Sequence, residues 1–246
     1  MPVIMLTQKR TPLCICSTPF HYSIDAMIKI LLSLVLLFHG ALFVCGNGWS
    51  FPSKATAVVT GGTKGIGRAV VSELAGTHRC RVLTCSRNAE ELQSCVEEWR
   101  ALGYDVRGVV ADVATADGRS KLIDDIRGFL AGEKLDILIN NVGTNIRKPS
   151  IEYSQEEVDF VWKTNFASMF GLTIGCHEFL KREKGEGTSS VVNIGSVAGV
   201  TCVKTGTPYA ATKAAMNQVT GNWACEWGPD GIRVNCVTPW YINTVS

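Results

Sequence analysis

Residues 55–70 of this 246-residue chain read ATAVVTGGTKGIGRAV, and they decide its fold. A short apolar run ends in a glycine-rich turn, and an amphipathic segment begins directly after the turn. This order is typical of a β-strand, a phosphate-binding turn and an α-helix. The glycines follow a TGxxxGIG spacing, with Gly61, Gly65 and Gly67, rather than the GxGxxG of the common dinucleotide fingerprint. Glycine tolerates positive φ and the close approach of a ligand, so the turn predicts a pyrophosphate site.

The same alternation of apolar runs and amphipathic segments continues along the chain. It predicts strands at residues 57–59, 81–85, 106–111, 135–139, 190–195 and 232–237, and helices at residues 89–102, 122–129, 155–183 and 208–227. Strands that alternate with helices form a parallel sheet with helices on both faces. We therefore expect a single α/β domain with a doubly wound, Rossmann-type parallel sheet over residues 51–246.

The composition suits one globular domain with a sizeable core. The chain is 46% hydrophobic and carries a formal net charge of +2. The near-neutral balance and the absence of a basic stripe in the sequence argue against a nucleic-acid partner. Ten cysteines are scattered along the chain without a CxxC pair. This pattern favours buried reduced thiols over disulfides, and it predicts no metal site.

Residues 1–50 are expected to lie outside the fold. Residues 28–38 and 41–45 are strongly apolar, and His39 and Gly40 interrupt them. The run is slightly short of the ~20 residues that span a bilayer, and it fits the apolar region of a secretory signal peptide better. A cleaved targeting signal is the first interpretation and an uncleaved anchor, with membrane contact through residues 28–45, is the second. A plastid presequence and a misassigned upstream extension remain alternatives, so the location is either the secretory pathway or the plastid.

Tyr209 and Lys213 are the first candidate catalytic pair. Their spacing of four residues places them on one face of a helix, one turn apart. A tyrosine normally titrates near ~10, and a fixed ammonium nearby lowers that pKa. The pair is therefore a candidate proton donor, although taken alone it is better explained as two surface side chains that share a helix face.

Several motifs in a fixed order change that balance. The glycine turn is followed by NNVG at residues 140–143, then by Asn165, Ser196 and the Tyr209–Lys213 pair. In this order they resemble the short-chain dehydrogenase/reductase family. Within it the chain looks most like the plant-type tropinone reductase-like proteins. The stretches that carry the closer resemblance are NNVGTNIRKP at 140–149, YAATK at 209–213, ACEW at 224–227 and PWYI at 239–242.

The resemblance implies an NADPH-dependent oxidoreductase that reduces a small carbonyl compound to an alcohol. Tyr209 would protonate the substrate oxygen, and Ser196 would hydrogen-bond the same oxygen. Lys213 would lower the pKa of Tyr209 and bind the nicotinamide ribose, and Asn165 would hold a water that connects Lys213 to solvent. Asn165 as a plain buried amide bonded to the backbone, and Ser196 as a turn cap, remain alternatives. For the whole protein, the alternatives are a 3-oxoacyl-carrier-protein-type reductase, a dinucleotide-binding fragment without turnover, and a membrane-anchored interaction protein.

The choice of cofactor depends on the end of the second strand. Ser86 and Arg87 stand there without an acid, and Lys64 adds a positive charge, which favours the 2′-phosphate of NADPH over NADH. The alternative is that Arg87 is a solvated charge. Asp112 is expected at the adenine edge, with a helix N-cap as its alternative. The expected cofactor contacts are Gly61, Thr63, Lys64, Gly65, Ile66, Gly67, Ser86, Arg87, Asp112, Val113, Asn141, Gly143, Tyr209, Lys213, Pro239, Ile242 and Thr244.

The resemblance also bears on the end of the chain and on assembly. Family members continue through a segment that covers the substrate and a last edge strand, whereas this sequence stops at Ser246. We therefore expect a C-terminally truncated domain in which residues 232–237 leave one edge of the sheet unpaired. The helices that begin at Gln155 and Pro208 carry apolar residues on more than one face, although a helix that covers a sheet needs only one apolar stripe. The resemblance implies that these two helices pair with their copies, so we expect a homodimer or homotetramer.

Overall fold

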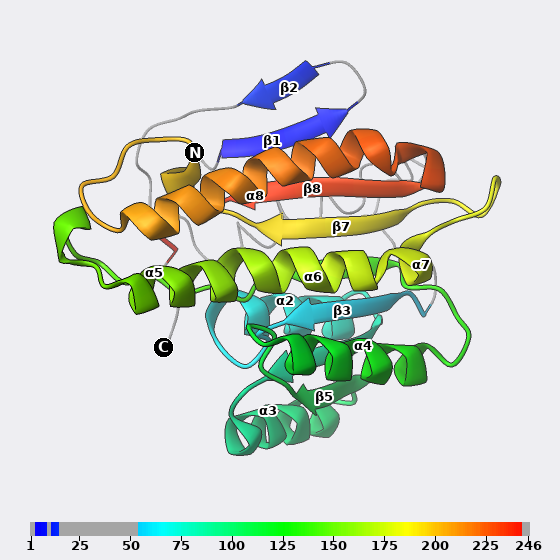
Figure 1. Cartoon of the computed structure of the whole chain (residues 1–246). Coiled ribbons are helices and arrows are strands. Elements are labelled where there is room, and N and C mark those ends of the chain that lie inside the picture. Colours follow the sequence, from blue (N-terminus) through cyan, green and yellow to red (C-terminus); the bar gives the residue numbers. More distant parts are fainter. Residues whose placement is uncertain (1–2, 9–10, 15–53, 243–246) are drawn as a thin grey trace.

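The computed structural model describes residues 3–8, 11–14 and 54–242 (Figure 1). The apolar run at residues 28–45, expected as a targeting segment, lies outside the described residues, as does the expected cofactor contact Thr244. In the described part of the chain, no helix is long and apolar enough to cross a membrane.

The core of the molecule is one sheet of eight strands in the order β2-β1-β8-β7-β6-β3-β4-β5. The six strands from β8 to β5 are parallel to one another, which confirms the predicted doubly wound α/β fold. Their bounds are close to those expected from the sequence. They are β3 Thr56–Thr60, β4 Arg81–Ser86, β5 Val106–Val110, β6 Ile137–Asn140, β7 Ser189–Ile194 and β8 Ile232–Thr238.

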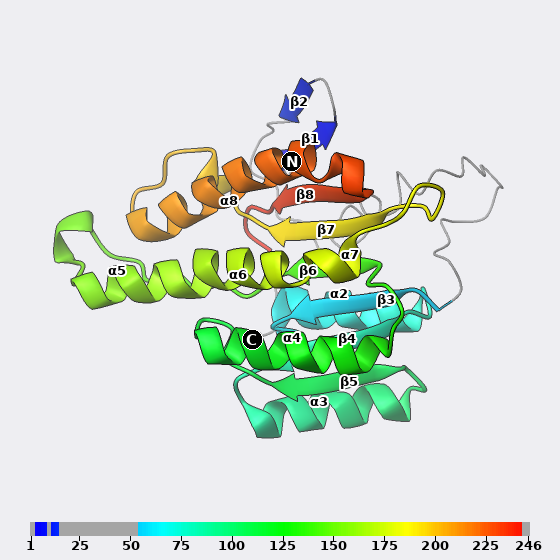
Figure 2. The same ribbon diagram turned by 45° about the vertical axis from the view of Figure 1, so that its right-hand side comes forward.

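Helices cover both faces of this sheet (Figures 1 and 2). On one face α2 (Gly65–Gly76) and α3 (Ala89–Ala101) pack with their apolar sides against β3 and β4. On the other face lie α4 (Ala116–Leu130), α6 (Ser168–Gly175), α7 (His177–Leu180) and α8 (Thr207–Glu226). All residues of β3 are buried, as expected for a central parallel strand that is covered on both sides.

The long helix expected over residues 155–183 is interrupted. It consists of α5 (Gln155–Trp162), a π-helical turn η2 (Lys163–Ala167), α6 and the short α7. A π turn widens the helix locally, and such turns occur frequently at functional sites. Asn165 lies in this turn, which interrupts the α-helix at the position where the family's helix-kinking asparagine was expected. Short 3-10 helices η1 (Ser150–Glu152), η3 (Val197–Gly199) and η4 (Gly228–Asp230) complete the chain.

The outer edge of β8 is covered, contrary to expectation. Strand β1 (Val3–Gln8) pairs with it antiparallel, in the register Val3 to Thr238 and Met5 to Cys236. Strand β2 (Thr11–Cys14) then pairs with β1 (Figure 1). The prediction of an unpaired edge was therefore wrong, and part of residues 1–50 lies inside the sheet rather than outside the fold. The physical reason is that the backbone groups of an edge strand accept any extended segment that reaches them.

The described cysteines follow the expectation of buried thiols in part, because Cys202 and Cys225 are exposed. Seven are free thiols, and five of these are buried in the two halves of the core: Cys80, Cys85, Cys95, Cys176 and Cys236. Burial raises the pKa of Cys176 and of Cys236 to about 12, so both remain neutral thiols at physiological pH.

Candidate active site

The glycine turn joins β3 to α2 in a geometry that favours glycine. Gly61 has a φ of 67°, and its N–H donates to the carbonyl oxygen of Cys85 at 3.0 Å. A Cβ on Gly67 would lie 2.2 Å from the carbonyl oxygen of Gly61, so any larger residue would push α2 away from the turn. Lys64, the N-cap of α2, offers no side-chain acceptor to the helix. The first N–H groups of α2 therefore lack a capping acceptor and are suited to bind an anion.

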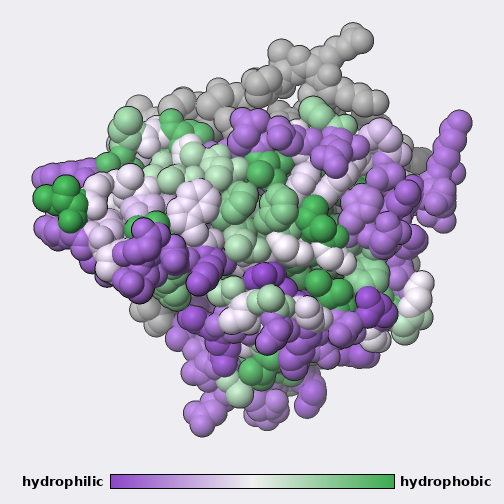
Figure 3. Space-filling model, viewed as in Figure 1, coloured by the Kyte–Doolittle hydropathy of each residue, from purple (hydrophilic) through white to green (hydrophobic). Residues whose placement is uncertain are grey.

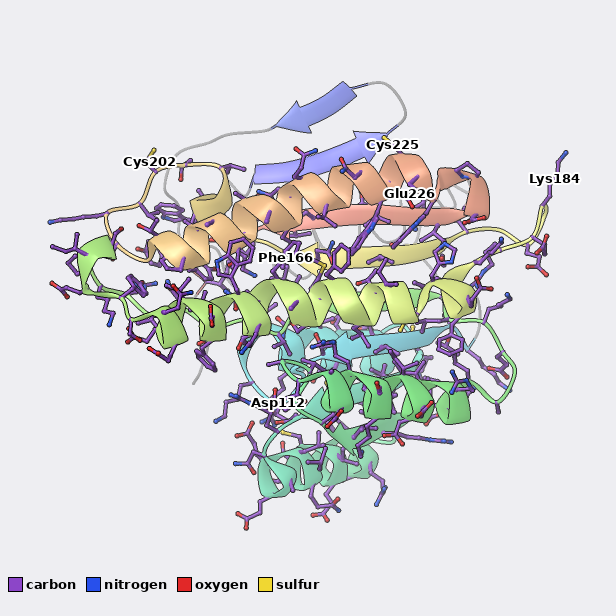
Figure 4. The ribbon with its side chains drawn as sticks, viewed as in Figure 1. Asp112, Phe166, Lys184, Cys202, Cys225 and Glu226 are labelled. Carbon is purple, nitrogen blue, oxygen red and sulfur yellow. The ribbon has the colours of Figure 1, made fainter. Side chains whose placement is uncertain are left out.

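This turn forms one wall of a cleft of about 770 Å³ at the carboxyl ends of β3, β4, β5 and β6. The strand order reverses between β3 and β6, which is where doubly wound sheets bind dinucleotides. Figure 4 shows Asp112 at the end of β5, on this side of the sheet. The cleft brings together eleven of the expected cofactor contacts: Gly61, Thr63, Lys64, Gly65, Ile66, Ser86, Arg87, Asp112, Val113, Asn141 and Gly143.

Three of the remaining expected contacts serve the structure around the cleft. Gly67 lies behind the turn and permits its close approach to α2. The carbonyl oxygen of Pro239 accepts the N–H of Val197 at 3.1 Å, and Ile242 packs on the core. None of Gly67, Pro239 and Ile242 lines the cleft.

Asp112 does not cap the helix that follows it. Its carboxylate accepts the N–H of Ala114 at 3.1 Å, whereas the N-cap of α4 is Thr115, which accepts the N–H of Gly118. The alternative of Asp112 as a helix N-cap was therefore wrong, and its position in the cleft agrees with the expected adenine edge.

The cleft also contains an acid that the sequence analysis missed. Glu91 Oε2 lies 2.8 Å from Lys64 Nζ, and hydrogen bonds from Lys64 and Thr63 hold the pKa of Glu91 below its usual range. Glu91 is the third residue of α3, and its N–H is capped by Asn88. The Asn-x-x-Glu spacing is the signal that could have placed this carboxylate at the start of the helix. Lys64 therefore faces the cleft as a member of an ion pair, whereas Arg87 has no carboxylate within 4.0 Å among the described residues.

The remaining lining residues that were not expected are Cys85, Asn88, Ala111, Val142, Thr144 and Thr164. They come from strand ends, a loop and the π turn. Most carry no recognisable motif, because their position in the cleft follows from how those elements meet.

Ser196 and Tyr209 line a second cavity of about 430 Å³. Ser196 follows β7, and its hydroxyl oxygen accepts the N–H of Ala198 at 3.1 Å. Its own proton is thus left for another acceptor, and its hydroxyl group lowers the pKa of the neighbouring Tyr209. Tyr209 is the third residue of α8, in the first turn after the N-cap Gly206, which has a positive φ of 86°.

Lys213 lies between the two cavities. Its ammonium donates to the carbonyl oxygen of Ile194 at 2.6 Å, and it is 5.7 Å from the centroid of the Tyr209 ring. A Cβ on Gly143, which lines the first cleft, would lie 3.5 Å from Lys213 Nζ. Lys213 is almost completely buried, so one side chain reaches the wall of the first cleft and the tyrosine of the second cavity.

The pKa values differ from the expectation. Burial raises the pKa of Tyr209, and the hydrogen bond from Ser196 and the charge of Arg147 oppose that rise only in part. Burial also lowers the pKa of Lys213 to about 8. The sequence predicted that Lys213 lowers the pKa of Tyr209, whereas in the structure that pKa is raised, because desolvation is the largest effect at both residues. Tyr209 is a protonated acid at neutral pH, and Lys213 is still largely an ammonium there.

Asn165 is buried and bonded to the backbone of Thr144 in both directions. Its Oδ1 accepts the N–H of Thr144 at 2.7 Å, and its Nδ2 donates to the carbonyl oxygen of Thr144 at 2.9 Å and to Thr212 at 3.1 Å. This is the alternative considered from sequence. A Cβ on Gly143 would lie 3.6 Å from Asn165 Oδ1, so this oxygen and Lys213 Nζ share one neighbourhood. One lone pair of Oδ1 is left for a further donor there.

Comparisons with known proteins agree with this geometry. Residues 55–246 match the family model of the short chain dehydrogenases. A tropinone reductase homolog of Arabidopsis thaliana is 53% identical over 196 residues, which make up 80% of this chain and 72% of that protein. Actinorhodin polyketide ketoreductase, solved as a variant with NADPH, has a TM-score of 0.71 at 29% identity and covers 78% of this chain and 72% of its own. A short chain dehydrogenase of Burkholderia cenocepacia in complex with NADP has a TM-score of 0.71 at 28% identity, over 78% of this chain and 76% of its own.

The fold, the site and the comparisons together show that the protein is an α/β oxidoreductase of the dehydrogenase/reductase type. The chain belongs to the short-chain dehydrogenase family. Within that family it is tropinone reductase-like, as the motifs at residues 140–149 and 239–242 predicted.

Proposed function

We propose that this enzyme reduces a small ketone to an alcohol with NADPH. The observation that carries the proposal is the position of Lys213, which links the glycine-turn cleft to the cavity of Ser196 and Tyr209. A carbonyl group in the second cavity would face the tyrosine proton from one side. Its carbon would face the first cleft, where the cofactor binds.

The residues of the first cleft fit a dinucleotide. The turn of Gly61 and Gly67 leaves room for a pyrophosphate against the uncapped N-terminus of α2. Ser86 and Arg87 at the end of β4 fit the adenosine ribose and its 2′-phosphate, and Asp112 and Val113 fit the adenine edge. NADP-bound relatives of the same fold support this assignment.

When bound, the cofactor supplies the hydride. Tyr209, protonated because burial raises its pKa, donates its proton to the substrate oxygen. Ser196 donates a hydrogen bond to the same oxygen and stabilises its growing negative charge. The Lys213 ammonium holds the ribose hydroxyls next to Gly143 and stabilises the tyrosinate that remains. Asn165, through its free lone pair, positions the water that returns a proton to this pair.

NADPH is proposed over NADH because Arg87 lines the cleft without a carboxylate partner among the described residues. Glu91 opposes this preference, since its carboxylate lies at the same rim and occupies Lys64. The assignment therefore depends more on Arg87 than on the pair of cations that the sequence indicated.

The test is a steady-state assay of the purified chain with NADPH and a panel of cyclic and linear ketones, followed by loss of NADPH absorbance. We expect turnover of at least one ketone, and we expect Tyr209→Phe to abolish turnover while NADPH binding stays nearly intact. Binding of NADPH without reduction of any ketone would favour the alternative of a dinucleotide-binding protein without turnover. Substantial activity in Tyr209→Phe would remove Tyr209 as the proton donor.

A further inference from the structure

The second cavity contains two positive charges and no negative one among its described lining residues. Arg147 and Lys204 are its charged members, and both are exposed at its surface. The remaining lining residues are polar or apolar: Asn145, Ser196, Ala198, Cys202, Val203, Thr205, Tyr209, Trp240 and Tyr241. We propose that the carbonyl substrate of this enzyme carries a carboxylate, which Arg147 and Lys204 bind while its carbonyl group faces Tyr209. The proposal rests on the proposed reductase function and names its substrate class.

Neither cation is neutralised within the described part of the chain. The adjacent Lys148 has a carboxylate partner, Glu157, at 2.5 Å. In contrast, no described carboxylate oxygen lies within 4.0 Å of Arg147 or Lys204. A protein usually pairs or solvates such charges, and two cations at one cavity without a nearby acid give it a positive potential that concentrates anions.

The two cations come from loops far apart in sequence. Arg147 belongs to the loop after β6, and Lys204 belongs to the loop between η3 and α8. Figure 4 shows this second loop at Cys202, at the end of the molecule where α5 and α8 begin. The loop of Lys204 follows Ser196 and η3 and leads into the first turn of α8, which holds Tyr209, and Arg147 lines the same cavity as these two residues. The positive charges therefore lie at the cavity in which the carbonyl group would react.

Arg147 lies near both the aromatic wall and the proton donor. Its guanidinium carbon is 5.9 Å from the centroid of the Tyr241 ring, which limits the positions that this long side chain adopts. Its charge also lowers the pKa of Tyr209, an effect that requires proximity to the phenol. A guanidinium binds a carboxylate with two parallel hydrogen bonds, so a substrate held by Arg147 would be oriented as well as attracted.

Asn145 supplies an additional polar group in this cavity. Its side-chain oxygen is buried and has no hydrogen-bond partner among the described residues. The two ends of an amide are exchanged by a half-turn of the side chain, so this position presents either an acceptor or an NH₂ donor to a ligand. A buried polar atom without a partner is costly, and a polar substrate group in the cavity would satisfy it.

A carboxylate explains this set better than a neutral or cationic group does. A neutral ketone leaves both cations without a partner, and an ammonium is repelled by them. Hydrogen bonds to a charged group contribute about 1.5–3 kcal/mol, which corresponds to about 10-fold to 100-fold in binding.

The test compares carboxylates with their methyl esters at the same carbonyl group. Pyruvate, acetoacetate and levulinate, each paired with its methyl ester, vary the distance between carbonyl and carboxylate. We expect kcat/KM for at least one acid to exceed that for its ester by about 10-fold or more, mainly through a lower KM. We also expect this ratio to fall towards one in Arg147→Gln and in Lys204→Gln, and to fall with rising salt in the unmodified enzyme. Lys184→Gln is the matched control, because Lys184 lies at the opposite end of the molecule from Cys202 (Figure 4).

The outcomes separate this proposal from the proposed function. Equal kcat/KM for acids and esters, with ketone turnover intact, would overturn the carboxylate proposal and leave the reductase function standing. If no carbonyl compound is reduced, calorimetry of each acid and ester with the NADPH-saturated protein tests the carboxylate site directly. Tighter binding of an acid that is lost in Arg147→Gln but kept in Lys184→Gln supports the carboxylate site. Equal binding of acid and ester overturns it.

Discussion

At the scale of single residues, burial rather than charge sets the chemistry of Tyr209 and Lys213. The sequence placed an ammonium one helical turn from a phenol, which suggested a lowered tyrosine pKa. In the structure the ammonium donates to Ile194 and lies 5.7 Å from the ring centroid, and desolvation raises the pKa of the phenol. The pair is therefore a protonated acid beside a lysine that titrates near physiological pH.

This arrangement predicts a pH dependence of carbonyl reduction. The pKa of Lys213 is lowered to about 8, so its ammonium is complete below that pH and is lost as the pH rises through it. Tyr209 keeps its proton over the same range because its pKa is raised, and the nearby Cys236 remains a thiol. We expect kcat/KM for reduction and the affinity for NADPH to fall above pH ~8. Lys213→Met should have a lower kcat/KM and a lower affinity for NADPH at every pH, and its pH profile should lack this inflection. An unchanged inflection in Lys213→Met would assign the titration to another group.

A second prediction concerns Glu91. Replacing it by Gln removes a negative charge from the rim of the cleft and releases Lys64 from its ion pair. We expect the affinity for NADPH to rise about fivefold, or ~1 kcal/mol, while the affinity for NADH changes little.

Arg87→Asp should reverse the preference towards NADH. Both effects are measured by titrating each cofactor against tryptophan fluorescence.

Glu90→Gln is the control for this experiment, because Glu90 is an exposed neighbour that does not line the cleft. Equal NADPH affinity of Glu91→Gln and Glu90→Gln would show that the ion pair does not compete with the 2′-phosphate. Equal affinity of the unmodified protein for both cofactors would show that Arg87 and Lys64 are solvated charges.

At the scale of elements, the junction between the glycine turn and α2 is tightly packed. Gly67→Ala places a methyl group 2.2 Å from the carbonyl oxygen of Gly61, so α2 must shift. We expect a loss of about 1–3 kcal/mol in the free energy of unfolding, together with a large loss of dinucleotide affinity. Gly128→Ala, within α4, adds a methyl group with no described atom within 4 Å, so it should instead stabilise the protein by about 0.5–1 kcal/mol. Chemical denaturation and cofactor titration of both variants check this, and unchanged stability of Gly67→Ala would contradict the packing argument.

The edge of β8 gives a second prediction at this scale. Because β1 pairs with β8, deletion of residues 1–14 should leave backbone groups of β8 exposed to solvent or to other chains. We expect faster amide hydrogen exchange in β8 and increased aggregation, whereas β3 and β4 should exchange as before. Unchanged protection of β8 in the shortened chain would show that β1 does not cover this edge in solution.

At the scale of the whole molecule, one helical face carries a series of aromatic side chains, of which Trp162 and Phe170 are exposed while Trp223 and Trp227 are buried. Trp162, Phe166, Phe170, Trp223 and Trp227 form a continuous series with successive centroids 4.7–5.7 Å apart. They lie on α5, η2, α6 and α8 or directly after α8, and Phe166 is labelled between these helices in Figure 4. Figure 3 shows apolar and weakly polar side chains together in the middle of this face. Such a continuous patch is typical of a protein–protein interface.

We therefore expect the protein to sediment as a homodimer or homotetramer that associates through α5, α6 and α8. Phe170→Glu, at a side chain that is 40% exposed, should shift it towards monomer. Leu102→Glu is the control, because Leu102 is 64% exposed and follows α3 on the other side of the sheet. Sedimentation of the unmodified chain as a monomer alone would contradict the expected assembly, and thermal melting shows whether each variant is folded.

The positions of the six parallel strands along the chain and the identity of most site residues follow from local sequence. A buried parallel strand needs a continuous apolar run, and a dinucleotide turn needs glycines at fixed spacing, so residues 55–70 already determine strand, turn and helix. The end of each later strand then had to lie at the same edge of the sheet, which is why eleven expected contacts meet in one cleft. The targeting role of residues 28–45 stays a prediction, with the secretory pathway or the plastid as its destination.

What the sequence by itself determined is therefore the fold class, the family and the candidate catalytic residues, because these depend on local patterns and their order. The tertiary structure alone decided the ion pair of Lys64 with Glu91, the direction of the tyrosine pKa and the strand that covers β8. It also decided that Arg147 and Lys204 meet at one cavity. These features depend on contacts between groups that are distant in sequence, or on how far burial removes a charge from water. A local sequence pattern encodes neither the distant contacts nor the extent of burial.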